Sequence, residues 1–320
     1  MDLFEHLSGG SRKQSTIDSY ERRLRVLNDG RPVNNLAFLY NYEVILEKMQ
    51  KYKMATQRGF IIAIVSVLKD VKTMKSMYDK YSKLLEHYNH EMKNNNTKSE
   101  TQKDNWITQE EVYTAYNRLY EDVYPILCST DGFAVLATKS HKKKSITALD
   151  WSKITELIIL SLFVLQPPRR ILDYMIMYIV QKLPKQMDTE INYLSLSTNT
   201  FYFNNYKTSG TYKTQEVPVS DRLQEILECY IKIHPLKITA KTGIPLLCNY
   251  EGNPFSTSNQ ITKILNKIFM RYTGKKISIN LLRNIFLTDK FKPQNDKLND
   301  TAYDMGTSAS MIQSTYIKND

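Results

Sequence analysis

The sequence has little of what disulfide-stabilised, zinc-binding and membrane-spanning proteins need. Only 3 of its 320 residues are cysteine, and Cys128, Cys229 and Cys248 are widely spaced, so we expect core cysteines and neither a disulfide framework nor a zinc cluster. The longest apolar run, 157–165, is interrupted by Ser161 and is too short to cross a membrane. No basic stretch followed by an apolar one opens the chain, so we expect no signal peptide. These absences favour an intracellular protein without a membrane partner.

Motifs that hold phosphate or metal ions are also missing. The chain has 10 glycines and 5 histidines, but no glycine-rich phosphate loop and no group of His, Cys, Asp and Glu at metal-ligand spacing. It has no internal repeat. We therefore expect no cofactor and no bound metal.

Positive charge is in excess. Lysine and arginine number 44 against 33 acidic residues, which gives a net charge of +11. Such a surplus is typical of proteins with a polyanionic partner, most often nucleic acid. Lysine, asparagine and tyrosine are abundant while arginine is scarce, which is also the bias that an AT-rich genome imposes. Composition alone leaves both explanations open.

Apolar residues recur at helical spacing throughout the first third of the chain. Ile17, Tyr20, Leu24 and Leu27 are spaced by three and four residues, which predicts a helix that begins near Ser15. Three further helices are expected within 36–49, 56–72 and 74–92. This part therefore reads as a helical module.

The composition changes at 93–103, a stretch without any apolar residue. It is too polar to be buried, and a capping-box pattern at Thr108–Glu111 restarts a helix beyond it. We expect two domains, 1–96 and 106–320, joined by a linker at 97–105. At roughly 100–200 residues per domain, the length agrees with this division.

Residues 106–320 are expected to be mostly helical with one β interruption. An apolar helix ends at Pro167 and Pro168, and a second helix is expected from Arg170 to Val180. Three short β-rich runs follow, at 193–196, 201–203 and 215–219. Polar turns separate them, which predicts a small antiparallel sheet. The expected fold class is mainly α with a small antiparallel β-sheet.

Three arginines stand in unusual settings. Arg169 and Arg170 follow the end of a buried helix, and Arg283 lies inside the mainly apolar helix 277–286. A charge in such a place must find an anion or remain expensive. A salt bridge to a nearby carboxylate is the commoner reason when each arginine is judged alone. Lys207 lies in a polar turn, where an exposed lysine is ordinary.

Taken in order, four short segments resemble the motif boxes of the tyrosine recombinase (phage integrase) family. Residues 170–173, Arg-Ile-Leu-Asp, resemble the first box, in which an acid follows an arginine by three residues. The turn 206–210 is similar to the family's β-hairpin lysine, and 280–283, Asn-Leu-Leu-Arg, resemble its His-x-Leu-Arg box. Residues 305–316 resemble the last box, which leads from a glycine to a tyrosine. The resemblance extends over nearly the whole chain.

The resemblance implies a site-specific DNA recombinase, an integrase that cleaves and rejoins duplex DNA. Tyr316 would be the nucleophile and form a 3′-phosphotyrosyl intermediate, while Arg170 and Arg283 would hold the phosphate oxygens. Lys207 would act as the general acid on the 5′ oxygen, with Lys213 as the reserve candidate. The ester bond retains the energy of the cleaved bond, so neither ATP nor a metal is expected.

Three positions depart from the family pattern. Asn280 stands where His or Lys is usual, and Thr307 stands where His or Trp is usual; both can still hydrogen-bond phosphate. Asp173 replaces Glu in a supporting role. Two alternatives therefore stay open: a catalytically degenerate DNA-binding protein and a type IB topoisomerase.

The resemblance also implies partners and an architecture. A helical core-binding domain and a catalytic domain would form a C-shaped clamp on double-stranded DNA, as a homotetramer on synapsed sites and a monomer when free. Further DNA contacts are expected from five side chains: Lys53, Gln57 and Arg58 near the start of the third helix, and Lys142 and Lys143 in a basic loop. The implied location is intracellular, at DNA in the cytoplasm or nucleus of a host, or in a virion. The composition and the divergent boxes suggest a viral or mobile-element origin.

Overall fold

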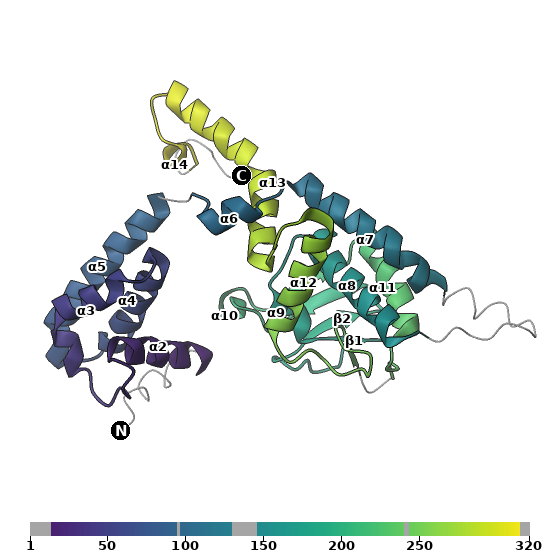
Figure 1. The fold of residues 1–320 in the computed structure, drawn as a ribbon, viewed down its shortest axis with the longest axis horizontal. Coiled ribbons are helices and arrows are strands. Elements are labelled where there is room, and N and C mark those ends of the chain that lie inside the picture. Colours follow the sequence, from purple (N-terminus) through teal and green to yellow (C-terminus); the bar gives the residue numbers. More distant parts are fainter. Residues whose placement is uncertain (1–13, 95–96, 130–145, 240–242, 314–320) are drawn as a thin grey trace, which may run out of the picture. The chain divides into compact units, whose positions relative to one another are not determined.

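The computed structural model describes residues 14–94, 97–129, 146–239 and 243–313 (Figure 1). The chain divides into two compact units, Met1–Lys98 and Ser99–Asp320. Each unit has its own hydrophobic core. Within the described residues, no helix combines the length and the apolar character that a bilayer crossing requires.

The first unit is helical throughout its described part. Its helices are α2 (Gln14–Leu27), α3 (Tyr42–Gln50), α4 (Met54–Leu68) and α5 (Lys75–Asn94), with short 3-10 turns η1 (Ala37–Tyr40) and η2 (Lys72–Met74). Helix α4 lies at the centre and packs against α2, α3 and α5. Leu24 and Leu27 of α2 are fully buried, as the spacing of three and four predicts. The four helices expected from periodicity are confirmed.

The second unit is built around one buried helix. Its helices are α6 (Glu100–Asn105), α7 (Gln109–Ser129), α8 (Ala148–Val164), α9 (Ile171–Met175), α10 (Ser209–Tyr212), α11 (Asp221–Ile233), α12 (Ser258–Thr273), α13 (Ile279–Asp304) and α14 (Ala309–Met311). Helix α8 is buried from Ile154 to Val164, and α7, α11 and α12 pack around it. The capping box expected at Thr108 is present, because Thr108 and Glu111 exchange side chain to backbone hydrogen bonds at the start of α7.

Helix α6 lies in the stretch that was expected to be a linker. Ser99 and Gln102 form a capping box at its start, and none of its residues is buried. Local capping therefore contributes to ordering this polar segment. Lys275 Nζ donates to the carbonyl of Asp104 at 2.6 Å, which ties α6 to the connection between α12 and α13.

The sheet has five strands in the order β4-β3-β2-β1-β5. They are β1 (Met177–Val180), β2 (Asn192–Ser195), β3 (Thr200–Phe203), β4 (Gln215–Pro218) and β5 (Ile244–Pro245). Strands β1 and β2 are parallel, whereas the other pairs are antiparallel. The three runs expected as strands are β2, β3 and β4, and they pair antiparallel as expected. The whole sheet is mixed rather than antiparallel, because β1, which was expected to be helical, pairs with β2 in parallel.

The helix expected from Arg170 to Val180 is also wrong beyond Met175. Helix α9 ends there, and β1 begins two residues later. Met177 and Ile179 are buried while Tyr178 and Val180 are half-buried, which is the alternation of a strand. Strand β1 lies between β2 and β5, so backbone pairing on both sides outweighs the local helical pattern.

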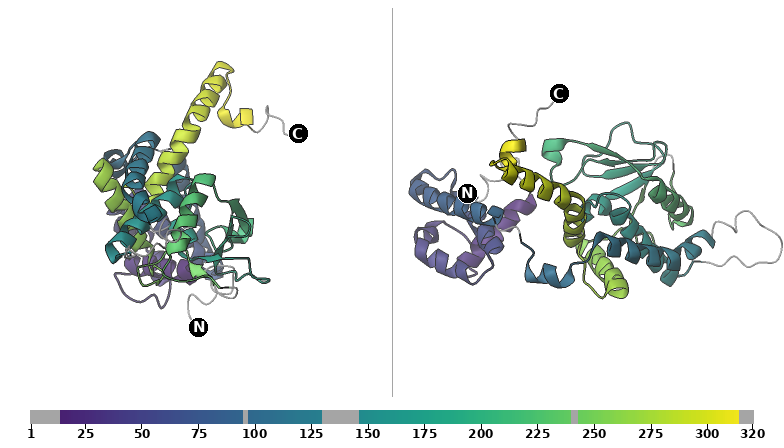
Figure 2. Two further views of the ribbon diagram at one scale, coloured as in Figure 1. Left: turned by 90° about the vertical axis from the view of Figure 1, so that its right-hand side faces the viewer. Right: turned by 90° about the horizontal axis from the view of Figure 1, so that it is seen from above.

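Helix α13 is only partly embedded in its unit. Leu281, Leu282 and Ile285 near its start are buried in the core, but every residue from 289 to 297 is exposed. Figure 2 shows the later part of α13 extending beyond the body of the second unit, and α14 follows its end. The start of α13, which carries Arg283, is therefore the part held in place by packing.

Candidate active site

One buried carboxylate in the second unit, that of Asp173, pairs with Arg169 and lies within range of the charges of Arg170 and Arg283. Arg169 and Arg170 precede α9, Asp173 lies in the first turn of α9, and Arg283 lies near the start of α13. The pKa of the Arg283 guanidinium is lowered, first by burial and then by the charge of Arg170, while Asp173 opposes the shift. Arg283 is therefore close enough to Arg170 and Asp173 to interact with both. The structure brings together these three residues expected at the site.

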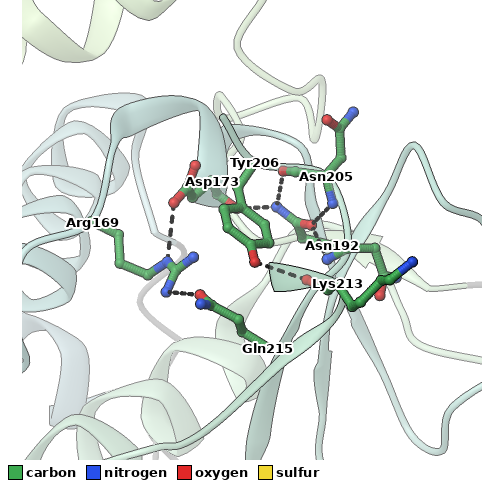
Figure 3. Close-up of polar contacts among 8 residues, drawn as sticks. Arg169, Asp173, Asn192, Asn205, Tyr206, Lys213 and Gln215 are labelled. Carbon is green, nitrogen blue, oxygen red and sulfur yellow. Dashed lines mark hydrogen bonds and ion pairs between the residues drawn. The ribbon is translucent and has the colours of Figure 1, made fainter. Parts of the chain in front are cut away.

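The neighbours Arg169 and Arg170 differ in their contacts. Arg169 Nε lies 3.0 Å from Asp173 Oδ2, and Arg169 Nη1 donates to Gln215 Oε1 at 3.0 Å (Figure 3). Its guanidinium also stacks 3.7 Å from the centre of the Phe203 ring. Arg169 thus has the structural salt bridge that was the alternative reading for Arg170.

Arg170 and Arg283 have no ion pair within the described part of the chain, and both are half-buried. Arg170 is the N-cap residue of α9, where the helix dipole favours an anion rather than a cation. Two half-buried guanidinium groups without a carboxylate of their own have the chemistry to bind a planar or tetrahedral oxyanion.

Asp173 lies buried beside Arg169 and Arg170. Its side chain is 3% exposed, and burial raises its pKa from 3.8 more than the attraction of Arg169 and Arg170 lowers it. The carboxylate forms its ion pair with Arg169, and the charge of Arg170 also acts on the carboxylate. Asp173 thus holds the chain segment that presents Arg170.

The lysine-bearing connection runs from β3 to β4. It contains the one-turn helix α10, and both Lys207 and Lys213 are exposed on it. Tyr206 Oη donates to the carbonyl of Lys213 at 2.8 Å, which closes the connection near its base (Figure 3). Lys213 has φ 59° and ψ −158°, a conformation that residues other than glycine seldom adopt. The connection therefore exposes two amino groups, those of Lys207 and Lys213.

The remaining site residues are placed differently. Asn280 is exposed one turn before Arg283, so the two share a face of α13. Thr307 lies beyond the other end of α13, where its N–H donates to the carbonyl of Ala302 at 2.9 Å. At 1.5 Å per residue, that end is about 30 Å along the helix from Arg283. The structure does not bring Thr307 to the arginines, and Tyr316 lies outside the described residues.

Two of the three side chains expected to contact DNA from the first unit form hydrogen bonds within that unit. Lys53 is exposed at the N-cap of α4. Gln57 donates to the carbonyl of Tyr52 at 2.6 Å and accepts a hydrogen bond from Tyr88, so both ends of its amide are used. Arg58 donates to Asn89 Oδ1 at 2.6 Å. Lys53 is the most accessible of these three; Lys142 and Lys143 lie outside the described residues.

A second group of reactive side chains is inert. Cys248 is buried, and its Sγ lies 3.2 Å from His234 Nε2. Burial raises the pKa of the Cys248 thiol to about 11 and lowers the pKa of His234. Both groups are therefore neutral near pH 7, and the pair does not supply a thiolate. Cys229 is half-buried, and the side chain of Cys128 lies outside the described part of the chain. No group of metal-ligating side chains occurs among the described residues.

No local pattern points to Gln215 or Asn192, because both act through contacts between segments far apart in the chain. The sequence shows Arg169 next to Arg170 but not which of the two reaches Asp173. No family model matches the chain, and no curated protein or solved structure resembles it.

Proposed function

We propose that this chain is a site-specific DNA recombinase that cleaves and rejoins duplex DNA through Tyr316. The observation that carries the proposal is the pair Arg170 and Arg283: they come from distant parts of the sequence, the fold places them within range of each other's charge, and neither has an ion pair in the described residues. A phosphodiester supplies the two non-bridging oxygens that such a pair binds. The order of the four motif segments supports the same function.

The proposed chemistry needs a nucleophile, a positive cradle and an acid. The Tyr316 oxygen attacks the phosphorus, the bond from phosphorus to the 5′ oxygen breaks, and the 3′ phosphate stays on the tyrosine. Arg170 and Arg283 stabilise the charge that develops on the phosphate oxygens. Lys207 or Lys213 gives a proton to the departing 5′ oxygen. Attack by a 5′ hydroxyl reverses the step, so no ATP is consumed.

The two units have separate roles in this proposal. The first unit binds the duplex through phosphate contacts that include Lys53, and the second carries the chemistry. The proposed arrangement is a C-shaped clamp around DNA, with four copies on two synapsed sites. The net charge of +11 supports binding to a polyanion.

The position of Thr307 favours a second candidate, a DNA-binding protein that does not cleave. The last motif box begins about 30 Å along α13 from Arg283, and Asn280 has no group that takes up a proton. A protein of this kind keeps the arginine pair for binding. The two candidates differ in one product, the covalent adduct.

The test is adduct formation on nicked suicide duplexes of randomised sequence, without metal or ATP. The nick lets a short 5′ fragment diffuse away, so that the covalent complex accumulates and survives SDS. We expect an adduct with the native protein and none with Tyr316→Phe. Tyr303→Phe is the matched control, because Tyr303 is a highly exposed tyrosine near the end of α13 and its loss should leave the yield unchanged. Binding without any adduct would favour the second candidate.

A further inference from the structure

Asn192 joins the segment that carries Arg170 to the connection that carries Lys207 and Lys213. It is the first residue of β2 and is completely buried. Its Nδ2 donates to the carbonyl of Asp173 at 2.7 Å and to the carbonyl of Asn205 at 3.0 Å. Its Oδ1 accepts from the N–H groups of Asn204 and Asn205, both at 2.8 Å. Figure 3 shows Asn192 between Asp173 and Asn205.

These four bonds use the whole capacity of the side chain. An amide has two N–H donors and two acceptor positions, and each one is paired here. A fully satisfied buried polar group gives a defined geometry, because any displacement leaves a donor or acceptor without a partner away from water. No other residue type of this size supplies two donors and an acceptor of two bonds.

Three of the four bonds hold the base of the β3–β4 connection, and the fourth holds α9. Thr214 Oγ1 donates to Asn204 Oδ1 at 2.9 Å, and Tyr206 donates to the carbonyl of Lys213. These bonds fix the base of the connection, Asn204 and Asn205, and the mostly exposed residues from Lys207 to Lys213 extend from it. Asn192 sets the position of this base relative to Asp173, and hence relative to Arg170.

We infer that Asn192 is a positioning residue that holds the proton-donating lysine against the phosphate bound by Arg170 and Arg283. The inference rests on the proposed function for the role of the lysine, but not for the fastening itself. Asn192 touches no reacting atom. It acts by keeping the lysine-bearing connection in register with the arginine-bearing segment.

The fastening is tested by limited trypsin digestion of the full chain. Trypsin needs a locally extended backbone, so opening of the connection should raise the rate of cutting after Lys207 and Lys213. Loss of the buried amide leaves two N–H groups and two carbonyls without partners, so Asn192→Ala should raise the cutting rate about tenfold or more. Ser195→Ala is the matched control, since Ser195 is completely buried on the same strand and its hydroxyl contacts Ser197. Equal cutting rates in Asn192→Ala and the native protein would overturn the inference.

The positioning is tested with two duplexes that differ in one atom. In one, the 5′ bridging oxygen at the cleaved bond is replaced by sulfur, whose thiolate leaves without needing a proton. General acids contribute about 10²–10⁴-fold, so Asn192→Ala should slow cleavage of the oxygen substrate by about thirtyfold or more. Cleavage of the sulfur substrate should stay close to the native rate. Arg170→Ala should slow both, because it removes phosphate binding rather than the proton.

Equal losses on both substrates would mean that Asn192 has only a structural role, and would contradict the inference. If Asn192→Ala does not fold, Tyr206→Phe takes its place, because it removes only the hydrogen bond to the carbonyl of Lys213. Tyr206→Phe should slow cleavage of the oxygen substrate by a smaller factor and leave cleavage of the sulfur substrate close to the native rate. If the native protein forms no adduct with either duplex, the proposed function fails. The trypsin comparison then still decides whether Asn192 fastens the connection.

Discussion

Arg169 and Arg170 are adjacent in the chain but have different surroundings. Arg169 is held by Asp173, Gln215 and the ring of Phe203. The side chain of Arg170 forms no ion pair in the described residues, and its charge acts on both Asp173 and Arg283. The buried Asp173 carboxylate has Arg169 as its ion-pair partner, because the backbone at the start of α9 places the side chain of Arg169 beside it. In the proposed function, Arg170 binds the phosphate.

This difference predicts opposite outcomes for two neighbouring substitutions. Arg169→Ala leaves the Asp173 carboxylate buried without its ion pair, so the free energy of unfolding should fall by about 3 kcal/mol. Arg170→Ala should change it by less than about 1 kcal/mol, yet abolish the covalent adduct. Urea unfolding and the adduct assay on the same preparations check both values. A large loss of stability in Arg170→Ala would show that Arg170 is a structural residue.

His234 gives a second prediction at the residue scale. Its Nδ1 accepts from the N–H of Leu236 at 3.1 Å, and its other nitrogen lies 3.1 Å from the carbonyl of Pro245. Burial lowers the pKa of His234 from 6.5, so the unfolded chain binds a proton more readily than the folded chain. The stabilising contribution is therefore complete above pH 6.5 and is lost as the pH falls below it.

The measurement is urea unfolding between pH 7 and pH 5 for the native protein and His234→Gln. The native protein should lose up to about 1.4 kcal/mol per pH unit more than the variant, whose amide does not titrate. A steeper loss in His234→Gln would contradict the assigned direction of the shift.

At the scale of elements, α13 combines a packed start with an unpacked continuation. Ile285 is the last core residue, and positions 289–297 are exposed on every side. Pro293 lies inside this stretch and removes one backbone hydrogen bond. An isolated helical stretch of this length is marginal in water, so it opens readily.

Amide hydrogen exchange checks this description. Amides at 289–297 should exchange at least about a hundredfold faster than those of the buried helix α8. Pro293→Ala should slow exchange in this stretch about tenfold or more, because proline is roughly 3 kcal/mol less favourable than alanine in a helix interior. If Tyr316 reaches the arginines through bending of α13, the same variant should also lower the adduct yield. Slow exchange at 289–297 in the native protein would contradict the account.

The elements also show what the sequence could predict. Helices with a clear apolar period, such as α2 and α4, and the capping box at Thr108 follow from local rules. Strand β1 does not follow from local rules, because its pairing with β2 and β5 depends on residues far along the chain. For the same reason the sequence marked Arg170 and Arg283 but gave no sign of Asn192, whose four partners come from two other segments.

At the scale of the whole molecule, the positive charge is not confined to one unit. The net charge of +11 is spread over both units rather than gathered at the arginine pair. Binding of duplex DNA should therefore depend on many weak ionic contacts and fall steeply with salt. One arginine of the pair contributes little to that sum.

A salt titration of duplex binding checks this expectation. The affinity of the native protein should fall by about 10³-fold or more between 50 mM and 200 mM salt, if six or more phosphates are contacted. Arg283→Ala should lower the magnitude of the logarithmic slope by about one and leave most of the affinity, while the adduct is lost. Affinity that hardly changes with salt would contradict a clamp built on phosphate contacts.

The most direct test of the central claim is the identity of the residue that becomes joined to DNA. The adduct from a nicked duplex is digested with nuclease and trypsin, and the modified peptide is sequenced by mass spectrometry. We expect a nucleotide linked through its 3′ phosphate to Tyr316, with a free 5′ hydroxyl on the other DNA product. Attachment to any other residue, or no adduct on a duplex that the protein binds tightly, would contradict the account.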